Sequence, residues 1–164
     1  MRFSSQSCRS DQFARGGSLR PPWSRESTVL DQCISCGDCI AACPESILQP
    51  GPGKTPVVNF AKGPCTFCKQ CADACGHDVF NTAQAPWKIS ADITADCLLN
   101  KSVACRACTD TCDTRALRFK LQAGTVGSIS IDASQCTGCG ACASVCPVDA
   151  IAFSLRHDDE VSVR

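Results

Sequence analysis

The sequence predicts a small α+β protein made of two similar halves in tandem and stabilised by bound metal. Three observations lead to this prediction. Cysteine supplies 17 of the 164 residues, and all but Cys8 fall into four groups whose internal gaps are mostly two and three residues. Short strand-like runs lie between the groups. Aromatic residues make up only 5% of the chain, which has no tyrosine, so a large apolar core is not expected.

The cysteine content would suggest a disulfide scaffold in a secreted protein. However, the thiols come in sets of four with regular gaps, whereas disulfide frameworks usually scatter their spacings. No stretch combines a charged start, a long apolar run and a small-residue cleavage site. We therefore expect metal or cluster ligation in a reducing, cytoplasmic compartment.

Charge and hydropathy exclude other classes of partner. The 16 basic and 16 acidic residues balance, which argues against nucleic acid as a partner. No apolar run approaches the roughly eighteen residues of a membrane helix, so no membrane span is expected.

The fourth cysteine group gives the clearest motif. Residues 136–147 read C-T-G-C-G-A-C-A-S-V-C-P, which is the bacterial-ferredoxin spacing for ligating a 4Fe–4S cluster. A short loop of this kind can place three thiolates on three different irons. Gly138 and Gly140 between the thiols let backbone N–H groups approach the sulfides. The candidate ligands, group by group, are Cys33, Cys36, Cys39 and Cys43; Cys65, Cys68, Cys71 and Cys75; Cys97, Cys105, Cys108 and Cys112; and Cys136, Cys139, Cys142 and Cys146.

Zinc is the main alternative metal. Structural zinc is usually bound by two C-x2-C pairs that a longer span separates. Three cysteines at consecutive three-residue intervals suit a tetrahedral ion less well, because the middle thiolate would be crowded or surplus. We therefore favour 4Fe–4S clusters.

The third group differs from the others, because Cys97 and Cys105 are separated by seven residues instead of two. A longer loop costs little extra closure entropy, so the group can still reach a common cluster. The site could also be labile or empty. The sequence thus predicts three or four clusters.

Taken in order, the chain begins with residues 1–30, which we expect to form a flexible basic tail. Two prolines in Arg20-Pro-Pro-Trp23 stiffen this stretch, and Trp23 is expected to pack on the first domain, with partner docking as the alternative. Two-cluster ferredoxin-like domains are expected at 31–90 and 91–155, and a C-terminal tail at 156–164.

Each unit is expected to run strand, ligand loop, short helix, strand. The short helix runs into the fourth cysteine, as at 140–146, and at about two turns it is too short to be stable alone. Strand-like runs lie at 56–60, 87–89 and 128–131. A hydrophobic pair follows the last cysteine of each group: Ile47-Leu48, Val79-Phe80, Ala116-Leu117 and Ala150-Ile151.

The groups can pair in two ways. In two-cluster ferredoxins the fourth cysteine of each motif ligates the other cluster. We favour sequential pairing, in which groups one and two share one domain and groups three and four the other. The first domain would then hold one cluster with Cys33, Cys36, Cys39 and Cys75, and its neighbour with Cys65, Cys68, Cys71 and Cys43. A nested pairing, first with fourth and second with third, has one supporting feature: only Cys43 and Cys146 are followed by proline.

A more specific resemblance covers roughly residues 20–155. Arg20-Pro-Pro-Trp23, the C-x2-C-G-D-C run that leads to Cys43-Pro44, Cys65-Thr-Phe-Cys68, and the long gap before Cys105-Arg-Ala-Cys108 resemble the NapF ferredoxin-type proteins of periplasmic nitrate reductase systems. Gly76 in place of proline after the second group is a departure that removes no thiolate.

The resemblance implies a cytoplasmic iron–sulfur accessory protein with two bacterial ferredoxin-like (2 × 4Fe–4S) units in tandem. Such a protein binds the precursor of the molybdenum-containing catalytic subunit of periplasmic nitrate reductase and assists its maturation before export. No Ser-His-Asp arrangement, phosphate loop or nucleotide fingerprint is visible, so we expect no enzyme. The alternatives are a general low-potential electron carrier, the electron-transfer subunit of a larger oxidoreductase, or a structural cluster protein.

Overall fold

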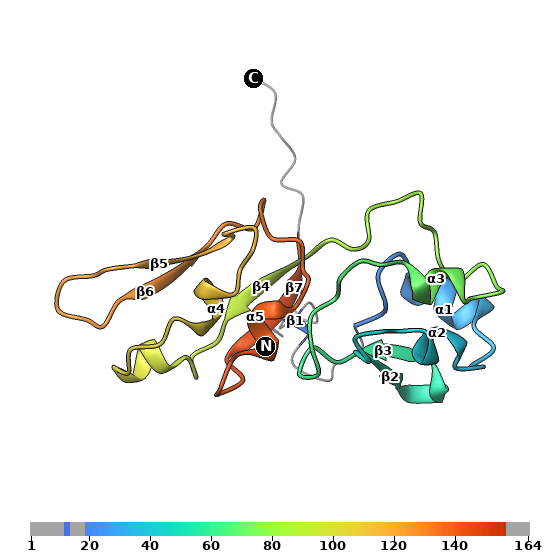
Figure 1. Ribbon diagram of the computed structural model, residues 1–164, viewed down its shortest axis with the longest axis horizontal. Helices are drawn as coiled ribbons and strands as arrows, with labels where there is room; N and C mark the ends of the chain where they lie inside the picture. The colour runs from blue at the N-terminus through green and yellow to red at the C-terminus, as the bar shows by residue number, and fades with distance from the viewer. Residues whose placement is uncertain (1–11, 14–18, 157–164) are drawn as a thin grey trace, which may run out of the picture.

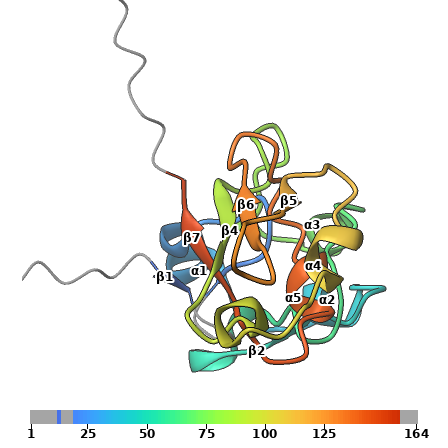
Figure 2. The same cartoon turned by 90° about the vertical axis from the view of Figure 1, so that its left-hand side faces the viewer.

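The computed structural model describes residues 12–13 and 19–156, which form two halves placed side by side along the longest axis (Figure 1). In the end-on view of Figure 2, the second half stands in front of the first. The first half contains α1 (Glu26–Gln32), α2 (Asp38–Ala41), β2 (Leu48–Pro50), a 3₁₀ helix (Pro52–Lys54), β3 (Pro56–Val58) and α3 (Gln70–Asp73). The second contains β4 (Ile89–Ile93), a 3₁₀ helix (Leu98–Lys101), α4 (Ala107–Asp110), β5 (Leu117–Lys120), β6 (Ser128–Ile131), α5 (Ala141–Ser144) and β7 (Ile151–Leu155). The expected mixture of short helices and strands is confirmed.

A hairpin follows the first cysteine group of each half. Strands β2 and β3 pair antiparallel in the first half, and β5 and β6 do so in the second. The backbone repeats beyond the strands as well: Asn59 N donates to Ile47 O at 2.7 Å, and Asp132 N donates to Ala116 O at 2.8 Å. The internal repeat read from the sequence is therefore a repeat of structure.

The second pairing in each half is unequal. In the second half β4 and β7 pair antiparallel along five residues, and β1 (Gln12–Phe13) adds to β7 to give the order β1–β7–β4. In the first half the corresponding contact is the single bridge between Ser24 and Phe80. The segment before group one, which carries Ser24, is therefore the counterpart in the first half of strand β4 in the second.

The expected N-terminal tail is wrong for residues 12–13 and 19–30, because this segment completes the fold. Leu19, Pro21 and Trp23 are buried. The Arg20 guanidinium donates to both carboxylate oxygens of Glu26 at 2.6 and 2.7 Å, and to Thr55 Oγ1 at 2.7 Å. The remainder of the range 1–30, with Cys8, and residues 157–164 of the expected C-terminal tail lie outside the described residues.

The expected boundary between residues 90 and 91 falls inside β4. Every residue of this strand pairs with β7, from Ile89 with Leu155 to Ile93 with Ile151. Because β4 is part of the second half's sheet, that half begins before residue 91.

The expected two-turn helices are also shorter than predicted, since α2, α3, α4 and α5 have four residues each. Three of them begin directly after a left-handed residue: Gly37 (φ 88°), Lys69 (φ 65°) and Gly140 (φ 82°). This conformation turns the chain sharply out of the ligand loop, so the helix has room for only one turn before the fourth cysteine.

Trp23 packs on the first half, as predicted. Its indole is 7% exposed and meets the Phe67 ring edge-on, with centroids 6.3 Å apart. Its backbone N–H donates to Pro86 O at 2.5 Å, and its carbonyl accepts from Asn81 N at 2.8 Å. Trp23 therefore ties the N-terminal segment to the stretch that joins the two halves.

Within the described residues, none of the helices has the length and apolar character needed to span a bilayer.

Replacing Trp23 with alanine is expected to destabilise the fold by about 3–5 kcal/mol, because it empties a buried aromatic site. The measurement is anaerobic guanidinium unfolding followed by visible absorbance. Leu121→Ala is the control, since Leu121 is 90% exposed and its loss should cost within about 0.5 kcal/mol. Equal midpoints for the two variants would contradict the packing role of Trp23.

Candidate iron–sulfur centres

All sixteen cysteines of the described residues are free thiols, and they gather in four sets of four. We call these sets rings one to four. Ring one is Cys33, Cys36, Cys39 and Cys75; ring two is Cys43, Cys65, Cys68 and Cys71; ring three is Cys97, Cys105, Cys108 and Cys146; and ring four is Cys112, Cys136, Cys139 and Cys142.

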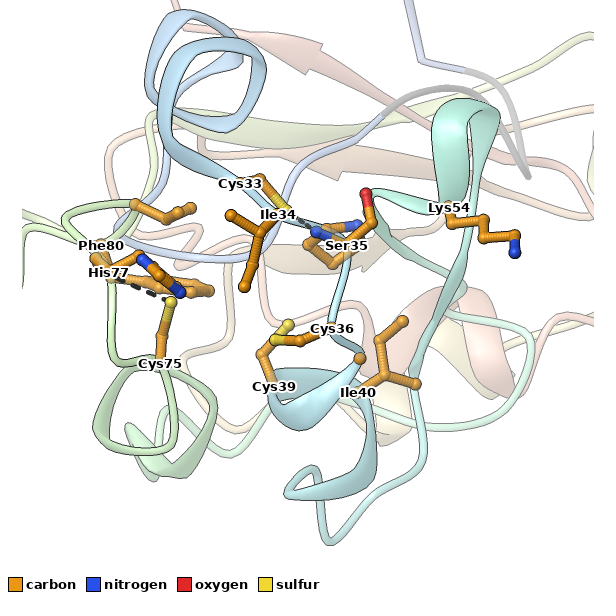
Figure 3. A pocket seen from close by; sticks show the side chains of 13 residues that line it. Cys33, Ile34, Ser35, Cys36, Cys39, Ile40, Lys54, Cys75, His77 and Phe80 are labelled. Atoms are coloured by element: carbon orange, nitrogen blue, oxygen red, sulfur yellow. Dashed lines mark hydrogen bonds between the residues drawn. The ribbon is translucent and has the colours of Figure 1, made fainter.

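Ring one lines a pocket between the loop before α2 and the end of α3. Figure 3 shows Cys75 on the segment after α3, facing the loop that carries the other three thiols. Burial raises the pKa of Cys39 to about 11, and the Cys75 thiol adds more to this rise than Cys33 or Cys36 does. The fourth thiol of ring one thus comes from the second cysteine group.

Ring two lines the neighbouring pocket, beside Pro22 and Trp23. Burial raises the pKa of Cys65 to about 11; the backbone N–H of Phe67 opposes the rise, and the Cys43 and Cys68 thiols add to it. Burial, followed by Cys65 and Cys43, raises the pKa of Cys71 to about 12. Cys43, from the first group, is therefore close to the thiols of the second.

Ring three contains the group with the seven-residue gap, and its four thiols line a pocket like those of rings one and two. The extra residues fold as the 3₁₀ helix Leu98–Lys101, which Ser102 ends in a left-handed conformation. Val103 N then donates to Leu98 O at 2.9 Å. The insertion is absorbed as a local turn, so Cys97 is close to Cys105 and Cys108 in space.

Cys146 supplies the fourth thiol of ring three. Burial raises the pKa of Cys108 to about 11, and the Cys97, Cys105 and Cys146 thiols reinforce the rise. The Cys146 sulfur also accepts the backbone N–H of Ala150 at 3.2 Å.

Ring four, like ring three, has two buried thiols, which are Cys136 and Cys142. Burial raises the pKa of Cys142 to about 12, with added repulsion from Cys139, Cys136, Cys108 and Cys112. Burial also acts to raise the pKa of Cys112, but N–H groups of the following turn and the Thr114 hydroxyl outweigh it and lower that pKa. The loop that carries Cys112 therefore favours the charged form of this thiol.

In all four rings the fourth thiol comes from the other cysteine group of the same half. This is the sequential arrangement of thiols, with groups one and two exchanging Cys43 and Cys75, and groups three and four exchanging Cys112 and Cys146.

The rings fit a group that presents several metal atoms. Four thiols surround a pocket in rings one to three, and backbone N–H groups of the loops point at ring sulfurs, as Ser35 N does at Cys33 Sγ (3.4 Å). Such donors stabilise thiolates and cluster sulfides. Across residues 19–156, no three His, Cys, Asp or Glu side chains are grouped so that they could hold one metal ion.

Comparison with known families agrees with this geometry. Residues 32–80 and residues 102–150 each match a 4Fe-4S dicluster domain. The chain is 40% identical to the ferredoxin-type protein NapF of Escherichia coli (strain K12) over 141 residues, which are 85% of this chain and 86% of the relative. It is 41% identical to the ferredoxin-type protein NapF of Haemophilus influenzae over 162 residues, or 97% of this chain and 92% of the relative.

A more distant relative is the methylamine utilization ferredoxin-type protein MauM of Methylorubrum extorquens, 29% identical over 153 residues. The alignment covers 81% of this chain and 70% of the relative.

Two dicluster domains in tandem and four rings of thiols define an iron–sulfur electron-transfer protein that carries 4Fe–4S clusters. The NapF relatives match most of this chain at 40% identity or more. The chain therefore belongs to the family of ferredoxin-type NapF proteins.

No sequence pattern indicates one feature of the centres, which is the contact between the two halves. Cys65 N of ring two donates to Cys139 O of ring four at 2.7 Å. Trp87 Nε1 donates to Thr137 O at 3.1 Å beside it. Spacing within a motif cannot indicate such a contact, because it depends on how one half packs on the other.

The assignment of ring three can be tested by pairwise loss of iron. Cys105→Ala and Cys146→Ala should each remove one cluster of about four irons, and the double variant should lose no more than either single variant, because both thiols belong to ring three. Combining Cys146→Ala with Cys36→Ala should remove two clusters. Iron and acid-labile sulfide are measured after anaerobic purification, with Cys8→Ala as the control that keeps the full content.

The nested pairing would be correct if the opposite pattern were found. In that pattern the iron losses of Cys146→Ala and Cys105→Ala add up in the double variant, whereas those of Cys146→Ala and Cys36→Ala do not.

Proposed function

We propose that this protein is a cytoplasmic electron-transfer factor that assists maturation of the catalytic subunit of periplasmic nitrate reductase before export. Family membership supports the proposal, together with the resemblance of the Arg20-Pro-Pro-Trp23 lead and the long third-group gap. It acts as an accessory protein and not as an enzyme. The sixteen ring cysteines ligate four 4Fe–4S clusters in this proposal.

The chain's own contribution is to hold, insulate and expose the clusters. A bound 4Fe–4S cluster supplies one-electron oxidation and reduction. Cys36 of ring one and Cys68 of ring two are exposed, whereas every thiol of rings three and four is buried or half-buried. This distribution lets electrons enter or leave the first half at the protein surface.

An exposed apolar pair beside ring one supports a protein partner. Leu30 on α1 is 67% exposed. Ile34, which lines the pocket of ring one (Figure 3), is 64% exposed. Large apolar side chains near an exposed ligand are suited to a protein–protein contact. We therefore propose Leu30 and Ile34 as the docking surface for the nitrate reductase catalytic precursor.

The second candidate function is a general low-potential electron carrier or the electron-transfer subunit of a larger oxidoreductase. One observation favours it: a relative that is 29% identical over 153 residues is named for methylamine utilization, so a related ferredoxin-type chain occurs in another system.

A pull-down separates the two candidates. The cluster-loaded, tagged chain should retain the nitrate reductase catalytic precursor, and Leu30→Ser with Ile34→Ser should weaken retention by at least about tenfold, because burial of two aliphatic side chains is lost. Leu121→Ser is the matched control, since Leu121 is exposed on the far hairpin of the second half. No retention, combined with rapid electron exchange with soluble reductases, would support the carrier instead.

Removal of iron is expected to unfold most of the chain. The four ring helices are single turns that are too short to be stable alone, and without iron the charged thiols of each ring would repel one another. Far-ultraviolet circular dichroism before and after anaerobic chelation measures the loss. Undiminished secondary structure in the iron-free chain would contradict stabilisation by the clusters.

A further inference from the structure

Rings two and four touch across the boundary between the halves. The Cys65 N–H donates to Cys139 O at 2.7 Å, so a ligand residue of one half is hydrogen-bonded directly to a ligand residue of the other. The Cys139 thiol is also close enough to act electrostatically on Cys65. No comparable contact joins rings one and three among the hydrogen bonds of the described residues.

Aromatic side chains enclose this contact. The Phe60 ring meets Trp87 with centroids 5.8 Å apart and Phe153 at 4.8 Å, and Trp87 meets Phe67 at 6.0 Å. Phe67 lies between Cys65 and Cys68 in the sequence, whereas Phe153 is on β7. These aromatic side chains therefore form a series of contacts from the ligand loop of ring two to the sheet of the second half.

Glycine in the ligand loop of ring four permits this close approach. A Cβ at Gly140 would lie 2.0 Å from the Phe60 ring, and one at Gly138 would lie 2.5 Å from Ile89 and 2.8 Å from Trp87 Nε1. The loop is thus shaped to receive the aromatic side chains, which holds rings two and four at a fixed separation. A single apolar core continues through both halves and includes Ile47, Phe60, Ile89 and Phe153.

Within each half the two rings are also neighbours. The Cys39 thiol of ring one is close enough to Cys71 of ring two to raise its pKa electrostatically. The Cys108 thiol of ring three does the same to Cys142 of ring four. Adding the contact between Cys65 and Cys139 gives one continuous spatial order: ring one, ring two, ring four, ring three. This order differs from the order of the cysteine groups along the chain.

We propose that the four clusters form a single electron relay in this spatial order and that the hydrogen bond from Cys65 to Cys139 is its crossing point between the halves. Electron transfer between fixed centres weakens steeply with separation, and this contact is a direct hydrogen bond between ligand residues of rings two and four. One electron moves at each step, oxidising the site that gives it and reducing the site that receives it, without a change in bonds or protons. A low-potential one-electron reductase is the class of donor that supplies the electron, and the redox centre of a protein that accepts one electron receives it at the other end of the relay.

The alternative is two independent two-cluster carriers joined by a linker. The relay rests on occupation of the four rings by 4Fe–4S clusters, which is part of the proposed function, but not on the identity of the partner.

Electron paramagnetic resonance of two paired variants distinguishes the relay from independent carriers. Cys36→Ala with Cys105→Ala disables rings one and three and leaves rings two and four. Cys68→Ala with Cys136→Ala is the matched control, which leaves rings one and three. After dithionite or photochemical reduction, the first variant should show broadened or split signals from two interacting spins, and the control should show two independent signals.

Independent signals in both variants, or interaction only in the control, would overturn the relay. Iron and sulfide analysis of the unsubstituted chain is performed first. A content below four clusters refutes the full set of ligand assignments, whereas full content without interaction refutes the relay alone.

A second pair of variants keeps all sixteen cysteine ligands. It tests the crossing point even if one of the paired cysteine variants fails to keep its two remaining clusters. Phe60→Ala should loosen the contact between rings two and four and reduce their magnetic interaction at unchanged iron content. Phe119→Ala is the control, because Phe119 packs under Arg106 in the outer hairpin of the second half, with the guanidinium 4.9 Å from its ring centroid. Identical spectra for Phe60→Ala and the unsubstituted chain would contradict the crossing point.

Discussion

Each ring of four cysteines takes three thiols from one loop and the fourth from the other group of the same half, and this exchange holds each half together. Cys75 closes ring one from beyond α3, and Cys146 closes ring three from beyond α5. Helices of four residues cannot persist by themselves, and the hairpins are short. Ligation therefore fixes the relative positions of elements that have little stability of their own.

The contact between the halves sets a second constraint on the same loops. Gly140 both begins α5 in a left-handed conformation and leaves the space that Phe60 fills. A side chain at this position would strain the backbone and collide with the aromatic ring. One residue thus serves the geometry of ring four and the packing of one half on the other, which brings the ligand loops of rings two and four into contact.

Much of the site follows from the sequence, because ligand spacing is a local property. The thiols of ring three could be predicted despite the long gap, because closing a longer loop costs little extra entropy. The structure shows that a 3₁₀ helix takes up the extra residues. The order of residues 19–30 was not predicted, because the role of this segment depends on a partner far along the chain, Phe80. Contacts such as Cys65 with Cys139 depend on tertiary packing for the same reason, and no spacing rule encodes them.

The most direct test of the account is the iron and acid-labile sulfide content of the anaerobically purified chain, measured together with its electron paramagnetic resonance after reduction. Four complete rings predict about sixteen irons and about sixteen sulfides per chain, with signals of reduced 4Fe–4S clusters. Zinc in place of iron, or a stable content of about eight irons with both halves folded, would contradict the assignment of the sixteen cysteines.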